Sequence, residues 1–185
     1  MDLSEESRLD ELQLRLVQPW LSMRLFRSIS KPFLSQARTM TTIATLKRLS
    51  AKSLSERILE EVNAADPTFA IIDVRDDDYI GGHIKGASNI PAHTLDAMMA
   101  TLVRRLKDKK TVVFHCALSQ IRGPSAALKY LRERDGLLRS MGEDPKGADG
   151  QEVFVLDKGF SGWQELYGED ERLTEGYVKD LWDNY

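Results

Sequence analysis

Cys116 and Arg122 are the two residues whose types and spacing could carry chemistry. Five residues separate them, Cys116 follows a short apolar run that ends at His115, and Arg122-Gly123-Pro124 begins a predicted helix. A loop that enters a helix N-terminus turns backbone amides inward, and the helix dipole adds partial positive charge there. These conditions favour the thiolate form of cysteine, which is its nucleophilic form. The pattern predicts a covalent catalyst that binds a tetrahedral oxyanion.

The other residues of this loop are predicted to support the same chemistry. The planar guanidinium of Arg122 suits bidentate binding of an oxyanion. Ser119 is a candidate donor to the anion or to the leaving thiolate. His115 either sets the ionisation of its neighbour or packs as an ordinary histidine at a strand end. The predicted oxyanion-binding loop comprises Ala117, Leu118, Ser119, Gln120, Ile121, Arg122 and Gly123.

A lone cysteine is more often a small buried hydrophobic residue than a nucleophile, so the spacing carries the prediction. Cys116 is the only cysteine, which excludes an internal disulfide. The three histidines, His83, His93 and His115, lack metal-ligand spacing, so we predict no metal site. A net charge of -3 argues against general nucleic-acid binding, and no apolar run is long enough to predict a membrane span.

Strands and helices alternate along the chain after the first quarter. Capping-box spacing at Ser53 predicts a helix that runs toward Ala65, and glycines with mixed charge predict an exposed loop over 135–150. Hydrophobic periodicity predicts strands at 69–74, 87–90, 111–114 and 153–156, and helices at 95–106 and 122–134. Alternation of this kind predicts an α/β fold with a central parallel sheet covered by helices on both faces. Ligands then bind at the carboxyl ends of the strands.

The chain is predicted to comprise a basic N-terminal extension (1–52), a catalytic domain (53–168) and a C-terminal tail (169–185). Residues 12–55 contain no Asp or Glu and resemble a mitochondrial targeting segment, although the acidic first residues do not. A disordered or weakly helical extension is the alternative. We expect a cytoplasmic or nuclear protein, or a mitochondrial one if translation starts at Met23.

The segment His115-Cys116-Ala117-Leu118-Ser119-Gln120-Ile121-Arg122-Gly123-Pro124 resembles the Cdc25-like group of rhodanese-fold proteins, which includes Cdc25 phosphatases and eukaryotic arsenate reductases. The resemblance spans 53–167 and implies a rhodanese-like three-layer fold. The loop is closer to the plant and fungal members than to mitotic Cdc25. Further matching segments are Ile72-Asp73-Val74-Arg75, 82–87 with Asn89-Ile90-Pro91, and 156–160 with Gly162-Trp163.

In this family Asp73, Arg75, His83 and Trp163 are expected to tie strand ends and loops together, so Asp73 and His115 are assigned as supporting residues. Cdc25 phosphatases carry acidic residues within the loop, where this chain has Ala117 and Ile121. The loop therefore offers no acid to protonate a leaving alkoxide, which favours aryl phosphates. The charged turn at 76–78 is more typical of a solvent-facing segment.

The resemblance implies a cysteine-dependent protein tyrosine or dual-specificity phosphatase, an arsenate reductase, or both, acting through a covalent Cys116 intermediate. The expected substrate is a phosphoprotein or a small oxyanion. No tightly bound cofactor is expected, and arsenate reduction would draw electrons from glutathione, with glutaredoxin as a candidate partner. A thiosulfate-type sulfurtransferase, whose loop is typically one residue shorter, and a non-catalytic rhodanese binding module stay open as alternatives.

Overall fold

The computed structural model describes residues 41–145 and 150–183. The prediction of a targeting or disordered segment over residues 1–40 lies outside these described residues. Within them, no helix is long and apolar enough to cross a membrane.

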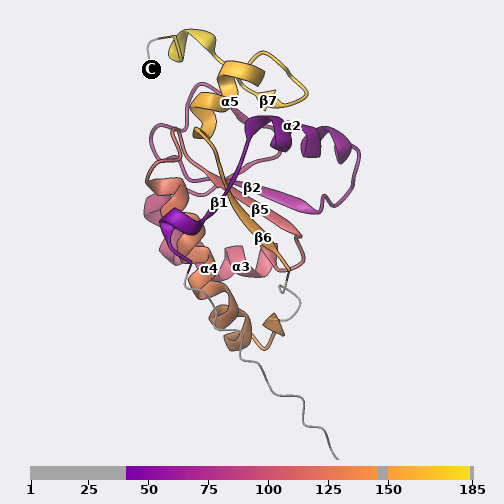
Figure 1. The fold of residues 1–185 in the computed structure, drawn as a ribbon, viewed down its shortest axis with the longest axis vertical. Coiled ribbons are helices and arrows are strands. Elements are labelled where there is room, and N and C mark those ends of the chain that lie inside the picture. Colours follow the sequence, from indigo (N-terminus) through magenta and orange to yellow (C-terminus); the bar gives the residue numbers. More distant parts are fainter. Residues whose placement is uncertain (1–40, 146–149, 184–185) are drawn as a thin grey trace, which may run out of the picture. The chain divides into compact units, whose positions relative to one another are not determined.

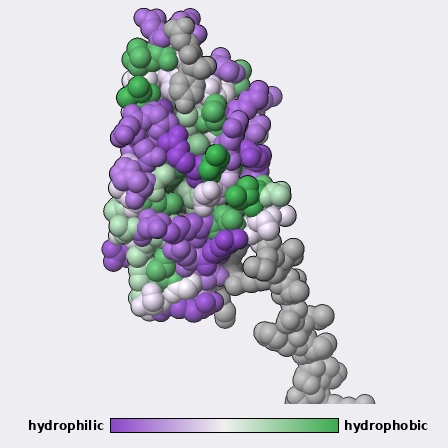
Figure 2. All heavy atoms as spheres, turned by 90° about the vertical axis from the view of Figure 1, so that its left-hand side faces the viewer, coloured by the Kyte–Doolittle hydropathy of each residue, from purple (hydrophilic) through white to green (hydrophobic). Residues whose placement is uncertain are grey.

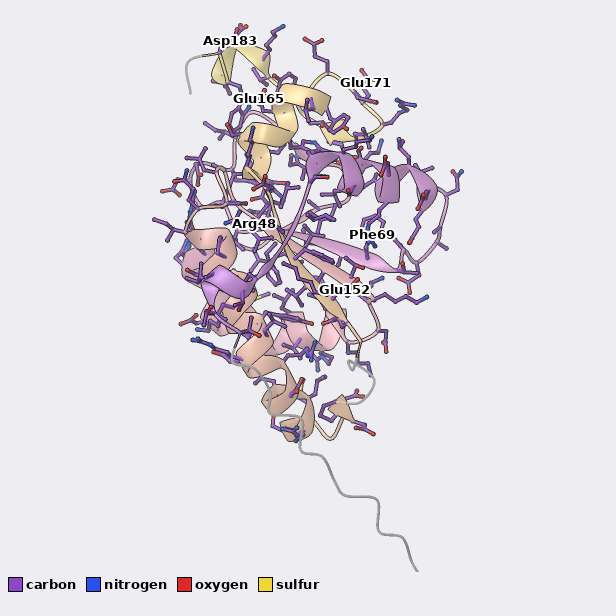
Figure 3. The ribbon with its side chains drawn as sticks, in the orientation of Figure 1. Arg48, Phe69, Glu152, Glu165, Glu171 and Asp183 are labelled. Atoms are coloured by element: carbon purple, nitrogen blue, oxygen red, sulfur yellow. The ribbon has the colours of Figure 1, made fainter. Side chains whose placement is uncertain are left out.

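A five-stranded parallel sheet forms the centre of the fold, in the order β1-β6-β5-β2-β4 (Figure 1). Its middle strand, β5, is buried at every position, as expected for a parallel sheet that is covered on both faces. The strands comprise β1 (Lys47–Leu49), β2 (Phe69–Asp73), β4 (Ser88–Asn89), β5 (Thr111–His115) and β6 (Glu152–Leu156). In Figure 3, Phe69 and Glu152 mark the amino ends of β2 and β6.

Helices cover both faces of this sheet, which gives the predicted three layers (Figure 1). Helices α3 (Leu95–Leu106) and α4 (Arg122–Ser140) pack on one face, where Val112 and Phe114 join their core. Helices α2 (Ala51–Glu60) and α5 (Gly159–Tyr167) pack on the other face, where Val113 contributes to a second core. Successive residues of β5 thus point to opposite cores, as the period of two in a strand requires.

The folded domain begins before Ser53, where the sequence analysis placed its boundary. Strand β1 pairs in parallel with β6 at the edge of the sheet, and Leu49 is buried in the core. The N-cap of α2 is Ser50, whose side chain accepts a hydrogen bond from the amide of Ser53. The predicted capping box at Ser53 was therefore three residues late, and the helix ends at Glu60 rather than near Ala65.

Helix α4 continues six residues beyond its predicted end at Arg134, to Ser140. The prediction of a loop over 135–150 is therefore wrong for residues 135–140, which are helical. Gly136 sits inside the helix, where a Cβ would meet nothing within 4 Å. Leu138 is buried against the sheet, and its burial offsets the poor helix propensity of the glycine.

The C-terminal segment is packed on the domain and is not a separate tail. Strand β7 (Thr174–Glu175) pairs antiparallel with β3 (His83–Ile84). Trp182 donates a hydrogen bond of 2.8 Å to the carbonyl of Gly81, and its ring packs edge-on against Phe160, with centroids 5.1 Å apart. The sequence boundary at 168 therefore divides one folded unit.

Substitution Trp182→Ala is expected to lower the free energy of unfolding by about 3 kcal/mol, because it removes a large buried aromatic side chain from this unit. Chemical denaturation would measure the loss. Val178→Ala is the control in the same segment, because Val178 is exposed and its truncation should change stability by about 0.5 kcal/mol or less. Equal, small effects of both substitutions would mean that the segment does not stabilise the domain.

Candidate active site

The candidate site lies where β5 ends and α4 begins. Residues 116–121 form the connecting loop, so Cys116 stands at the carboxyl end of the central strand. The neighbouring strand β2 ends beside it, with Asp73 opposite His115 in the parallel register. This is the edge of a parallel sheet at which ligands bind.

The loop folds back on the sulfur of Cys116. The amide of Ser119 donates a hydrogen bond of 3.2 Å to Sγ, and the Ser119 hydroxyl accepts one of 3.5 Å from the Cys116 amide. Ser119 is fully buried and has a left-handed backbone with φ of 50°, which tightens the turn. A backbone amide directed at sulfur stabilises a thiolate more than a thiol. The side chain of Ser119 accepts a hydrogen bond here, so its role as a donor to the anion or to the leaving thiolate stays a prediction.

Helix α5 holds the other side of the loop. The amides of Phe160 and Ser161 donate hydrogen bonds of 2.9 Å to the carbonyls of Cys116 and Ala117. Gly159 has a φ of +60°, and a Cβ there would lie 2.4 Å from both carbonyl oxygens. Only glycine fits this approach. These contacts turn the carbonyls of Cys116 and Ala117 toward α5.

The start of α4 leaves backbone donors available beside the sulfur. Its N-cap, Ile121, makes no side-chain capping hydrogen bond, and the first intrahelical bond runs from Ser125 to Ile121. The amides of Arg122 and Gly123 therefore belong to the orphan donors of a helix N-terminus. A cavity of about 150 Å³ opens here, lined by Cys116, Ala117, Leu118, Gln120, Ile121 and Arg122.

Arg122 lines this cavity, and its guanidinium is bound by two carboxylates. Nη1 and Nη2 each lie 2.6 Å from one carboxylate oxygen of Asp78, and Nη1 also donates a hydrogen bond of 3.0 Å to Asp76. The turn at 76–78 thus faces the site, which corrects the sequence interpretation that it faces solvent. Asp77 alone of the three is exposed.

The ion pairs shift the titration of all three partners. Hydrogen bonds from Arg122 lower the pKa of Asp78 in spite of partial burial. Burial raises the pKa of Asp76, but hydrogen bonds from His93 and Arg122 outweigh it, so that pKa is also lowered. The same hydrogen bond to Asp78 raises the pKa of Arg122. Both carboxylates are therefore ionised at neutral pH.

A second, fully buried ion pair lies beneath the loop. The Arg75 Nε atom donates a hydrogen bond of 2.8 Å to Asp73, whose other oxygen accepts 3.0 Å from the Arg75 amide. Arg75 also donates to the carbonyls of Ile80 and Gly82 and stacks on Phe160, 4.3 Å from the ring centroid. This network fixes the segment that carries Asp76 and Asp78, in agreement with the structural role expected for Asp73 and Arg75.

His115 is packed between this network and the loop. Its Nδ1 lies 3.4 Å from the carbonyl oxygen of Cys116, and its Nε2 lies 3.7 Å from Asp73 without a hydrogen-bond partner. Burial lowers the pKa of His115, although the charge of Asp73 opposes this. The imidazole is neutral at pH 7 and contacts the backbone of the cysteine, not its sulfur.

The remaining predicted supporting residues lie outside the loop. Trp163 is fully buried and donates a hydrogen bond of 2.9 Å to Thr174, and His83 lies 3.1 Å from Glu175. Both join the C-terminal segment to the domain. Among the described residues, no group of three or more His, Cys, Asp or Glu side chains is arranged to hold a metal ion.

Comparison with known proteins agrees with this geometry. The rhodanese-like domain matches residues 50–166, well over half of the chain. The chain belongs to the rhodanese-like family. A Cdc25-like phosphatase of Saccharomyces cerevisiae, YCH1, is 40% identical over 124 residues, covering 62% of this chain and 78% of that protein. Arsenate reductase 2.1 of Oryza sativa is 34% identical, covering 76% of this chain and 84% of that protein.

A solved structure extends the comparison of this rhodanese-like domain. A yeast protein tyrosine phosphatase of the rhodanese family superposes with a TM-score of 0.62 and 36% identity, covering 74% of this chain and 96% of that one. The predicted family and fold are therefore confirmed. The catalytic roles of Cys116 and Arg122 stay predictions, now with a defined geometry.

Substitution Asp73→Ala is expected to lower the free energy of unfolding by about 3–5 kcal/mol, because it leaves the Arg75 guanidinium buried without its counter-charge. Denaturant titration would measure this. The control is Asp157→Ala, because the ion pair of Asp157 with Arg48 is exposed and such pairs contribute about 1 kcal/mol or less. A loss for Asp73→Ala no larger than for the control would exclude a structural role for the buried pair.

Stability is expected to fall as the pH drops below about 6.5, the pKa of histidine in an unfolded chain. Burial lowers the pKa of folded His115, so below that pH the unfolded state takes up a proton that the folded state resists. The free energy of unfolding should decrease by up to about 1.4 kcal/mol per pH unit. His115→Gln should flatten this slope, whereas substitution of the exposed His93 by Gln should not. Identical slopes for wild type and His115→Gln would contradict the assignment.

Proposed function

We propose that this chain is a Cdc25-like phosphatase that uses Cys116 as its nucleophile and accepts arsenate in the same site. The observation that carries the proposal is the hydrogen bond from the Ser119 amide to Sγ, in a loop that ends at Arg122. A sulfur that accepts a main-chain hydrogen bond next to a helix N-terminus has the surroundings typical of a cysteine nucleophile. An inert core cysteine has no need of this arrangement.

The first chemical step is in-line attack by the Cys116 thiolate on phosphorus. The sulfur–phosphorus bond forms as the bond to the ester oxygen breaks, and the departing oxygen takes up a proton. The orphan amides of Arg122 and Gly123, with the amides of the loop, bind the equatorial oxygens. Water then attacks the phosphocysteine, which releases phosphate and regenerates the thiolate.

Aryl phosphates fit this site best among phosphate esters. No acidic residue occurs between Cys116 and Arg122, and a phenolate leaves with less help from an acid than an alkoxide does. Leu118 and Ile121 stand at the mouth of the cavity and are 44% and 75% exposed. Exposed apolar side chains beside an anion site favour a ligand with a flat apolar group next to its phosphate.

Arsenate is the second proposed substrate because a relative that this chain covers to 84% is named an arsenate reductase. Thiolate attack on arsenate forms a sulfur–arsenic(V) bond as one arsenic–oxygen bond breaks, and the departing oxygen takes up protons from solvent and leaves as water. Reduction to arsenite takes two electrons, and Cys116 is the only cysteine of the chain. Two equivalents of glutathione supply them and leave as glutathione disulfide, and glutaredoxin is a candidate to resolve a mixed disulfide.

The two alternatives are weaker on specific grounds. A sulfurtransferase loop is typically one residue shorter than the loop of this chain. A non-catalytic binding module would not need Cys116 and Arg122 at this spacing, and both are present. On the face drawn in Figure 2, hydrophilic side chains dominate and the apolar ones form separate, smaller patches. Such a face lacks the broad apolar surface of an obligate interface.

Substitution Cys116→Ser is expected to reduce kcat on p-nitrophenyl phosphate and arsenate reduction with glutathione and glutaredoxin by at least about a thousandfold, because a serine hydroxyl stays protonated at neutral pH and is a much weaker nucleophile than a thiolate. The two activities and thiosulfate-to-cyanide transfer would be measured side by side on the same preparations. Leu166→Ala, an exposed position on α5, is the control and should keep wild-type rates. Activity in Cys116→Ser, or thiosulfate as the preferred substrate, would refute the proposal.

A further inference from the structure

The carboxylate pair on Arg122 is the feature of the site that the proposed chemistry leaves unexplained. Asp78 accepts hydrogen bonds from both terminal nitrogens of the guanidinium, and Asp76 accepts one from Nη1 as well. One positive and two negative charges leave this cluster with a net charge of -1. An arriving oxyanion thus meets no net positive charge on the arginine side of the cavity.

The geometry of Asp78 mimics that of an oxyanion. Its two oxygens lie 2.6 Å from Nη1 and Nη2, the side-by-side pairing that arginine also makes with phosphate. Asp78 therefore competes for these two terminal nitrogens with any oxyanion that binds there, and the Nε–H is the donor outside this pairing. The pair is partly open to water, with 32% of the Arg122 side chain and 30% of the Asp78 side chain exposed.

Both carboxylates keep other donors when Arg122 leaves them. Asp76 also accepts hydrogen bonds from the backbone amide of His93, at 3.2 Å, and interacts with its Nδ1 at 2.9 Å. Asp78 accepts a hydrogen bond of 3.0 Å from the amide of Asp76. Loss of Arg122 therefore leaves neither carboxylate without a partner, which is the condition for exchange at low cost.

We propose that Asp78, assisted by Asp76, is a built-in competitor for the oxyanion, which holds Arg122 in the resting protein and yields it when a tetrahedral anion binds. The inference rests on the proposed function, because it assigns Arg122 to the anion. Asp78 is a positioning residue that acts through the guanidinium. It weakens oxyanion binding, so that the site responds to strongly charged anions and releases phosphate readily after turnover.

The test measures anion binding without turnover. Full-length wild type and Asp78→Asn are alkylated at Cys116 with neutral iodoacetamide at fixed pH and ionic strength, over a series of inorganic phosphate concentrations. The concentration that gives half-protection reports phosphate affinity, independently of the alkylation rate itself. Asp77→Asn is the matched control, since it removes the same charge from the same turn at the exposed position.

The half-protecting phosphate concentration is expected to fall about tenfold in Asp78→Asn, since one charge-assisted competitor is removed. It should stay within about twofold of wild type in Asp77→Asn. The KM for p-nitrophenyl phosphate should fall with it, since the same substitution favours every anion that uses Arg122. Asp76→Asn, which removes a single contact, should give an intermediate shift and serves as the second variant if Asp78→Asn does not fold.

Weaker protection in Asp78→Asn would overturn the proposal, because it would mean that Asp78 aims Arg122 at the anion. Equal shifts in Asp78→Asn and Asp77→Asn would overturn it too, since general charge would then explain both. Absence of protection in every variant would remove Arg122 from anion binding. A tenfold shift in a protein without turnover on any assayed substrate would support this inference while refuting the proposed function, so the two are tested separately.

Discussion

The rest of the site depends on one constraint, the directions in which the backbone carbonyls and amides of the loop at 116–121 point. The amides of Phe160 and Ser161 in helix α5 donate to the carbonyls of Cys116 and Ala117, and the amide of Ser119 faces the sulfur. A loop this short, between a buried strand and a helix packed on the sheet, has little freedom to turn otherwise. The close approach at Gly159 and the left-handed Ser119 are consequences of it. Within the described residues, the hydrogen bond to the Cys116 sulfur therefore comes from the main chain and not from a charged side chain.

Charged side chains add a second level of organisation around the Cys116 loop. The buried Asp73–Arg75 pair anchors the end of β2, and the turn that follows carries Asp76 and Asp78 to Arg122. Two ion pairs only a few residues apart thus have different effects. The fully buried pair stabilises the fold, because breaking it would leave an unpaired charge in the core. The partly exposed pair of Arg122 and Asp78 can exchange partners, because water and other hydrogen-bond donors can reach it.

Features that depend on residues close together in the sequence could be predicted, and features that depend on contacts between distant residues could not. The loop from Cys116 to Arg122 was predictable, since its chemistry lies in local spacing between a strand and a helix. The contact of Asp78 with Arg122 spans 44 residues and was missed, because charged turns usually face water. Strand β1 was missed because Lys47 and Arg48 are exposed and only Leu49 is buried. A two-sided hydrophobic pattern is absent from such an edge strand.

The two proposed reactions share one binding site and one first step. Phosphate and arsenate present similar tetrahedral oxygens to the loop amides, so main-chain donors alone discriminate poorly between them. What differs is the second step, since phosphocysteine needs water and the arsenic adduct needs thiols. Cys116 is the sole cysteine, and the loop mouth is open, with Leu118 and Ile121 exposed. An open mouth admits either water or an external thiol. The product is therefore set by which anion forms the adduct and by whether its co-reactant, water or a thiol, is present, a property of the surroundings as much as of the fold.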